Sequence, residues 1–178
     1  MRADGPVRRL GFDFEFLPNN LTNTGWLSAG FADNFGQRLY VVNEDADWEA
    51  AKEIPWMVDN VLVHIEEALP SEYVTTAQAR ERIQFFLEMQ DPQRYNTTLY
   101  AWCGAQDMVR LHGMWDHNWA VMPRTIPHSF VDIEEMLKAG GFGDEDVPQQ
   151  VDHHKHHALH DAEHDLDIVE FLLARRTM

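Results

Sequence analysis

Near its start the chain alternates apolar and polar residues. In LGFDFEFL (residues 10–17) phenylalanines and acids take alternate positions, a two-residue period that is typical of a β-strand. Successive side chains of a strand point to opposite faces. The pattern therefore predicts a strand with an aromatic face, made of Phe12, Phe14 and Phe16, and an acidic face, made of Asp13 and Glu15.

Two further strand-like segments follow. WLSAGFAD (residues 26–33) and QRLYVVNE (37–44) flank an Asn-Phe-Gly sequence that suits a tight hairpin turn. The chain is thus expected to open as an antiparallel meander of three strands. Later, the short apolar run LYAWCG (99–104) predicts a central strand that is buried on both faces.

Apolar residues at spacings of three and four predict helices elsewhere. Residues 48–69 read as helical in pieces, broken by Pro55 and closed by Pro70. A clearer helix extends from a cap at Thr75 or Thr76 to about Gln90. Its expected buried stripe consists of Ala79, Ile83, Phe86 and Leu87.

Three more helices are expected in the second half. One begins near Ala105, one spans SFVDIEEMLKAGG (129–141) with Ser129 as its candidate cap, and one begins near His157 after the loop GFGDEDVPQQ. Asp161 lies at the flank of the last helix's apolar stripe. That stripe consists of Leu159, Ala162, Leu166, Val169 and Leu173. The order of elements predicts an α/β fold, with residues 1–178 as a single domain.

Composition agrees with one globular domain. The chain has 178 residues, of which 44% are hydrophobic, enough for a proper core. Its start, MRADGPVRRL, lacks the apolar stretch of a signal peptide, and no later run is long enough to span a membrane. The single cysteine, Cys103, excludes an intramolecular disulfide, and its apolar neighbours predict a buried thiol. We expect a soluble, cytoplasmic protein without a membrane partner.

The net charge of −16 limits the possible functions. Such a charge argues against a general DNA coat that binds phosphates through bulk positive charge, so any nucleic-acid contact has to be local. Most of the 30 acids are interpreted as a solvated surface, which leaves a few as candidate metal ligands. Arg110, Lys155 and Arg124 are interpreted as surface residues without a role, although they lie near the candidate acids in sequence.

Two acidic motifs are candidates for chemistry. Asp13 and Glu15 share one face of a hydrophobic strand, where unpaired charges are costly, so a cation should face them. The alternative is an edge strand whose acidic face is simply hydrated. Asp107 follows the predicted central strand, at the sheet edge where α/β folds place their sites, but it equally suits the N-terminus of a helix.

The segment HHKHHALHDAEHD (153–165) is the densest in candidate ligands. On a helix His157, His160 and His164 share one face, a spacing that can hold zinc, although a solvated face that takes up metal opportunistically is the preferred interpretation. His156 is different, because it precedes the helix and lies five residues before Asp161.

In combination these motifs resemble a known family. Asp-x-Glu on a first strand, an Asp after a mid-chain strand and His-x4-Asp opening a C-terminal helix are similar to the DEDDh exonucleases of the ribonuclease H-like superfamily. The segments LYAWCGAQD, PRTIPHSF and HHALHDA are most similar to the small stand-alone exoribonucleases of actinobacteria and their phages. Two departures are FLPNNL in place of a Thr-Gly-Leu sequence and His157 where Asp, Asn or Arg is common.

The resemblance implies a mixed sheet, a three-strand antiparallel meander plus parallel strands, flanked by helices. It implies a 3′ to 5′ exonuclease with two Mg²⁺ or Mn²⁺ ions, which stabilise the attacking and leaving oxygens of the phosphodiester. Asp13 would bridge the ions, Glu15 and Asp161 would complete one site, Asp107 would support the other, and His156 would be the general base.

Substrate and assembly follow from the same resemblance. Single-stranded RNA or an RNA 3′ overhang is the expected partner, with DNA as the alternative, and nucleoside 5′-monophosphates are the expected products. Phe14 and Phe16, beside the first acids, are the expected substrate contacts, and a homodimer is the expected assembly. Two rival interpretations are an acidic protein that mimics nucleic acid and a nucleic-acid-binding module without turnover.

Overall fold

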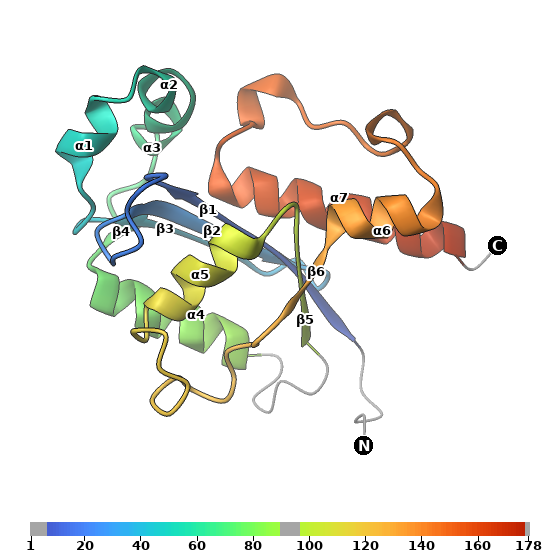
Figure 1. Cartoon of the computed structure of the whole chain (residues 1–178), viewed down its shortest axis with the longest axis horizontal. Coiled ribbons are helices and arrows are strands. Elements are labelled where there is room, and N and C mark those ends of the chain that lie inside the picture. Colours follow the sequence, from blue (N-terminus) through green and yellow to red (C-terminus); the bar gives the residue numbers. More distant parts are fainter. Residues whose placement is uncertain (1–6, 90–96, 177–178) are drawn as a thin grey trace.

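The computed structural model describes residues 7–89 and 97–176, which form a mixed sheet covered by helices on both faces (Figure 1). Within these residues the sheet has six strands in the order β4-β3-β2-β1-β5-β6. The pairs β1–β2 and β2–β3 are antiparallel, whereas β3–β4, β1–β5 and β5–β6 are parallel. The strands are β1 (Arg8–Phe16), β2 (Trp26–Asp33), β3 (Arg38–Asn43), β4 (Tyr73–Val74), β5 (Thr97–Ala101) and β6 (Phe130–Asp132). The predicted meander and the mixed α/β class are confirmed.

Helices α4 and α5 cover one face of the sheet. The phenylalanine side of β1 packs there, with Phe12 and Phe14 buried against Ile83 and Phe86 of α4 and Leu111 of α5. Thr75 caps α4 with its hydroxyl and Gln78 completes a capping box, so the predicted cap and stripe of this helix are confirmed. The bounds are Thr76–Glu88 for α4 and Ala105–Gly113 for α5.

The other face is covered by α7 (Ala158–Arg176), α6 (Ile133–Gly140) and a group of short helices. Two glycines bring α7 close to the sheet, because a Cβ on Gly11 would lie 2.0 Å from the carbonyl oxygen of Ala162 and one on Gly30 2.2 Å from the carbonyl carbon of Ala158. Close packing at these points places the first turns of α7 over the acidic face of β1. The short helices are α1 (Trp48–Lys52), α2 (Pro55–Met57), a π-helical turn (Val58–Leu62) and α3 (Val63–Ile65).

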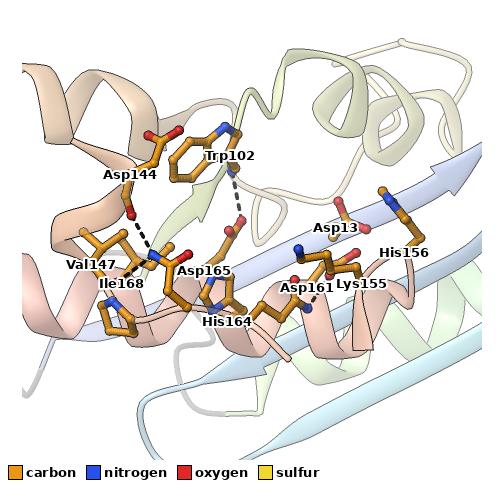
Figure 2. A pocket seen from close by; sticks show the side chains of 13 residues that line it. Asp13, Trp102, Asp144, Val147, Lys155, His156, Asp161, His164, Asp165 and Ile168 are labelled. Carbon is orange, nitrogen blue, oxygen red and sulfur yellow. Dashed lines mark hydrogen bonds between the residues drawn. The ribbon is translucent and has the colours of Figure 1, made fainter. Parts of the chain in front are cut away.

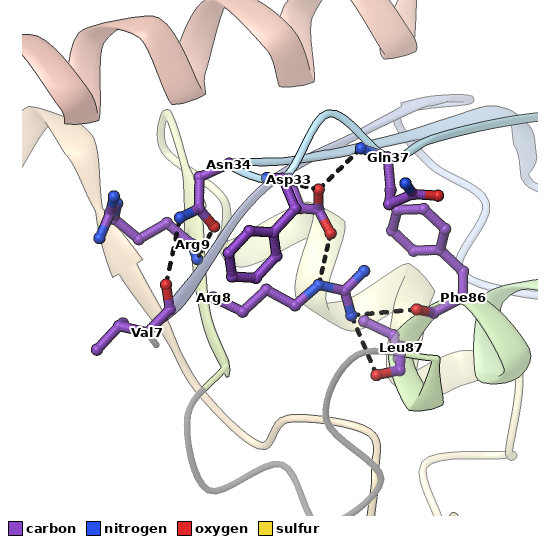
Figure 3. A network of polar contacts seen from close by, with 9 residues as sticks. Val7, Arg8, Arg9, Asp33, Asn34, Gln37, Phe86 and Leu87 are labelled. Atoms are coloured by element: carbon purple, nitrogen blue, oxygen red, sulfur yellow. Dashed lines mark hydrogen bonds and ion pairs between the residues drawn. The ribbon is translucent and has the colours of Figure 1, made fainter. Parts of the chain in front are cut away.

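A buried ion pair fixes the start of β1 (Figure 3). Arg8 donates from Nε to Asp33 Oδ2 at 2.7 Å and from Nη1 to the carbonyl oxygens of Phe86 and Leu87, both at 3.1 Å. Both charged side chains are almost fully enclosed. This arginine therefore ties β1 to the β2–β3 hairpin and to the carboxyl end of α4, where helix carbonyls lack intrahelical partners.

Three local predictions are wrong. The segment that begins at Ser129 is not helical from its start: residues 130–132 form β6, and the side chain of Asp132, not Ser129, caps α6. Cys103 is exposed, because the chain turns there with a left-handed φ of 51° directly after β5. Arg110 is buried, being 4% exposed.

The described helices include none that is long and apolar enough to cross a membrane. The expected end of α4 near Gln90 lies outside the described residues.

Candidate active site

A pocket of about 360 Å³ opens beside β1, along the first half of α7 (Figure 2). Asp13 lines it from the strand, and Asp161 and Asp165 line it from the helix. His156 and Lys155, from the segment before α7, lie on the same side of the pocket as Asp13 and Asp161 (Figure 2). The pocket thus joins segments that are nearly 150 residues apart in the sequence.

The acidic side of β1 faces α7 and not solvent. Strand β1 lies between β2 and β5, so the interpretation of Asp13 and Glu15 as the hydrated face of an edge strand is wrong. Glu15 is only 9% exposed, and Asp13 is partly buried. Gly11 belongs to the same side of the strand, and its contact with α7 holds the two acids close to that helix.

Asp107 approaches β1 from the first turn of α5. The pairing of β1 with β5 ends at Gly11 and Tyr100, so the backbone of Phe14 is beyond the paired region. The Phe14 N–H donates to Asp107 Oδ1 at 3.1 Å, and the Asp107 side chain is buried. Asp107 therefore satisfies both sequence interpretations: it is an acid in the first turn of a helix, and it lies at the carboxyl end of the central strands.

The segment before α7 brings His156 into the site. His156 has a left-handed φ of 63° and lines the acidic pocket, whereas its neighbour His157 lines a different pocket. One potential ligand atom from each of Glu15, His156 and Asp161 lies within 4.8 Å of the other two. Asp161 also accepts a hydrogen bond of 2.5 Å from Gln150 Nε2, which orients its carboxylate.

Mutual proximity and burial raise the pKa values of the acids in the site. Burial, and next the charges of Asp107 and Glu15, raise the pKa of Asp13 well above its usual range. Burial and the Asp161 carboxylate raise the pKa of Glu15 to about 8. Burial raises the pKa of Asp107 to about 6, although the Phe14 N–H and Arg110 oppose the shift, and burial likewise raises the pKa of Asp161.

The acids fit a site for hard divalent cations. Near pH 7 these acids can all be ionised only if a positive charge lies among them, because each buried negative charge makes ionisation of its neighbours less favourable. Lys155 lines the pocket, but its ammonium group pairs with Asp152 at 2.7 Å. Carboxylate oxygens are the ligands that Mg²⁺ and Mn²⁺ prefer. The donor set of Asp13, Glu15, Asp107 and Asp161 is therefore suited to such ions.

Of the two phenylalanines that were expected to contact substrate, Phe14 is enclosed in the core and Phe16 is partly accessible. Phe14 is 2% exposed and its ring packs edge-on against Trp26 and Phe31, so this side chain is not available to a substrate. Phe16 is half-buried, and the Arg110 guanidinium lies 3.9 Å from its ring centroid.

Trp56 of α2 is a neighbour of the site that sequence reasoning missed. It is half exposed and meets the His156 ring edge-on, with the centroids 4.8 Å apart. Its place next to His156 depends on the packing of the short helices, which no sequence spacing encodes.

Asp165 is a second residue of the site that sequence reasoning missed. It lies one helical turn after Asp161, lines the same pocket, and accepts a hydrogen bond of 2.9 Å from the backbone N–H of Trp102. This contact fixes the turn that leads from β5 toward Asp107. The i, i+4 spacing from Asp161 was the signal that could have revealed it.

The histidines divide between two locations. His164 lines the acidic pocket, whereas His157 and His160 lie in a second pocket with His64, His153 and His154. The predicted grouping of His157, His160 and His164 is thus not what the structure shows. Burial lowers the pKa of His157 to about 4 and also lowers that of His160.

Comparison with known proteins shows what this architecture is similar to. No protein-family model and no curated protein sequence matches the chain. The fold is similar to that of exonuclease I. A product-bound structure of exonuclease I matches with a TM-score of 0.59 and 12% identity, covering 97% of this chain and 45% of the other.

A second exonuclease I structure gives the same result. The Escherichia coli enzyme in complex with a dT13 oligonucleotide matches with a TM-score of 0.57 and 12% identity, over 97% of this chain and 41% of the other. The chain thus spans less than half the length of both exonuclease I structures, and the likeness establishes a ribonuclease H-like fold.

Proposed function

We propose that this protein is a metal-dependent 3′ to 5′ exonuclease of the DEDDh type, with residues 1–178 as one catalytic domain. The proposal depends on the convergence of four acids and one histidine. Asp13, His156 and Asp161 line one pocket, Glu15 lies close to His156 and Asp161, and the Asp107 charge acts on Asp13 and Glu15. The four acids come from three distant segments of the chain. Burying their charges together is energetically unfavourable, and a stable fold alone does not require it. The exonuclease I fold supports the same class of reaction.

The four acids would hold two Mg²⁺ or Mn²⁺ ions. Asp13 would contact both, Glu15 and Asp161 would complete one site, and Asp107 would support the other. Such ions neutralise the scissile phosphate and stabilise the charge on the attacking and leaving oxygens. They would also bring the pKa values of these carboxyls down, so that all four are ionised at neutral pH.

His156 would act as the general base. Its ring is half-buried, lies close to Glu15 and Asp161, and contacts the edge of Trp56. An imidazole can accept the proton of the attacking water near neutral pH and release it to solvent afterwards. Attack at the last phosphodiester yields a nucleoside 5′-monophosphate and a chain that is one nucleotide shorter.

RNA is the proposed substrate, because the motifs of the chain are most similar to those of small exoribonucleases. DNA is a second candidate that a specific observation favours, since a similar structure contains a dT13 oligonucleotide. Phe16, half-buried near the end of β1, is proposed as a substrate contact, and a homodimer is proposed as the assembly.

A single incubation tests the class, direction and sugar preference. The protein is mixed with 5′-labelled single-stranded RNA and DNA of matched sequence, with Mn²⁺, with Mg²⁺ and with chelator. A ladder that shortens from the 3′ end only with metal, faster on RNA, is the expected result. A faster ladder on DNA would make DNA the proposed substrate in place of RNA. Binding without any release of mononucleotides would favour the interpretation as a nucleic-acid-binding module without turnover.

A further inference from the structure

A second pocket of about 360 Å³ lies at the start of α7, and it is rich in histidine instead of aspartate. Its imidazoles come from three segments of the chain. His64 belongs to α3, and His153 and His154 belong to the turn before α7. His157 directly precedes α7, and His160 lies in its first turn. The acidic pocket holds none of these five residues.

The rings form a continuous group. The centroid of the His160 ring lies 4.3 Å from that of His154 and 4.2 Å from that of His157, and the His157 ring lies 5.9 Å from that of His64. Tyr40 of β3 closes the group by stacking on His157 at 4.4 Å. These four imidazoles thus form a connected series that lines one pocket.

Two ring nitrogen atoms in this group of described residues lack hydrogen-bond partners. Nδ1 of His157 and Nδ1 of His160 are buried and, within the described residues, have no hydrogen-bond partner. A buried polar atom without a hydrogen-bond partner is destabilising, so such atoms call for a ligand, an ion or a water molecule. Two of them in adjacent rings of one pocket point to a shared ligand.

We propose that His64, His154, His157 and His160 form a zinc site that is separate from the acidic centre. Imidazole nitrogen is a preferred ligand of Zn²⁺ and a poor one for Mg²⁺. A nitrogen about 2.0 to 2.1 Å from zinc puts its ring centroid about 3 Å from the ion, so two rings at the tetrahedral angle lie about 5 Å apart. The observed separations of 4.2 to 5.9 Å bracket this value.

Ring rotation completes the site. As the rings are oriented in the described part of the chain, no three of their nitrogen atoms lie within 4.8 Å of one another. The outer torsion of a histidine is broad, so rotation of stacked rings toward a common centre is a small change. The bound ion would fasten α3 to the start of α7, directly beside His156. This role is structural and does not depend on the proposed nuclease activity.

The proposal is tested by measuring how the whole protein binds Zn²⁺. A millimolar excess of Mg²⁺ is present, because Mg²⁺ occupies carboxylates but not imidazoles. Calorimetry should show one equivalent of Zn²⁺ bound to the wild type and to Asp161→Asn. A His157→Asn/His160→Asn double variant should bind about 100-fold more weakly or worse, since changes even beyond the ligands cost 10- to 100-fold. His117→Asn is the matched control, because His117 is exposed and has a left-handed backbone conformation that asparagine tolerates. This variant should bind Zn²⁺ as the wild type does.

A second measurement does not depend on the folding of the variants. Co²⁺ added to the wild type in Mg²⁺ should give the intense visible absorption of a tetrahedral site, and an anomalous peak at the zinc edge should lie among the four histidines. Zinc binding that Asp161→Asn abolishes and the double variant retains would place the ion at the carboxylates and overturn the proposal. Absence of zinc binding by the wild type in Mg²⁺ would overturn it as well.

Discussion

Replacement of Glu15 by Gln should stabilise the metal-free protein at alkaline pH. The pKa of Glu15 rises from its ordinary value of 4.5 to about 8, chiefly through burial. The folded state therefore holds more protons than the unfolded chain between these values, and stability falls as pH rises through that window. A shift of about 3.5 units at about 1.4 kcal/mol per unit corresponds to about 4 to 5 kcal/mol near pH 8. Because the amide must still be buried, we expect a gain of about 2 to 4 kcal/mol.

Urea denaturation in EDTA, followed by tryptophan fluorescence, measures this difference. Glu15→Gln should unfold at higher urea than the wild type at pH 8, and the two should nearly coincide at pH 5, where the folded wild type is protonated. Added Mg²⁺ should stabilise the wild type and have less effect on the variant. Glu81→Gln, an exposed change on α4, is the control and should alter neither curve. A Glu15→Gln variant that is no more stable than the wild type at pH 8 in EDTA would refute the reasoning.

Three further changes separate catalysis from folding. His156→Ala should lower the rate of nucleotide release by about 10²- to 10⁴-fold with an unchanged unfolding curve, and an unchanged rate would move the base to another residue. Gly30→Ala should destabilise the protein by about 3 kcal/mol in urea titrations, because its Cβ would lie 2.2 Å from the Ala158 carbonyl carbon; wild-type stability would contradict this packing. Asp165→Asn can still accept from the Trp102 N–H and should keep most of the activity, whereas complete loss would give the Asp165 charge a direct role.

The sequence predicted those strands and helices that are long enough to show a regular two-residue alternation or a helical spacing of apolar residues. The meander and the apolar stripe of α4 have long, consistent patterns, and Thr75 was one of the two predicted caps. Strand β6 was missed because three residues are too few to show a two-residue period, and the FVDIEEML sequence continues with helical spacing. The exposure of Cys103 was missed because a left-handed turn follows an apolar strand, and apolar neighbours carry no information about such a turn.

The candidate site likewise has residues that the sequence predicted and residues that it did not. The Asp13–Glu15 face follows from strand alternation, and Asp107 follows from the end of a strand. The histidine grouping was wrong because a helical wheel shows only the face of one helix and sees no distant residue. His160 and His164 both belong to α7 but line different pockets, and His64 comes from another helix.

The release of nucleoside 5′-monophosphate by Asp161→Asn tests the central claim most directly. The wild type, Asp161→Asn and Asp167→Asn, an exposed change on the same helix, are compared on 3′-labelled RNA with Mn²⁺ and with chelator. The account predicts metal-dependent release by the wild type and Asp167→Asn, and a loss of about 10³-fold or more in Asp161→Asn at unchanged fold, since the carboxylate is a proposed metal ligand. Release by Asp161→Asn at the wild-type rate would contradict it.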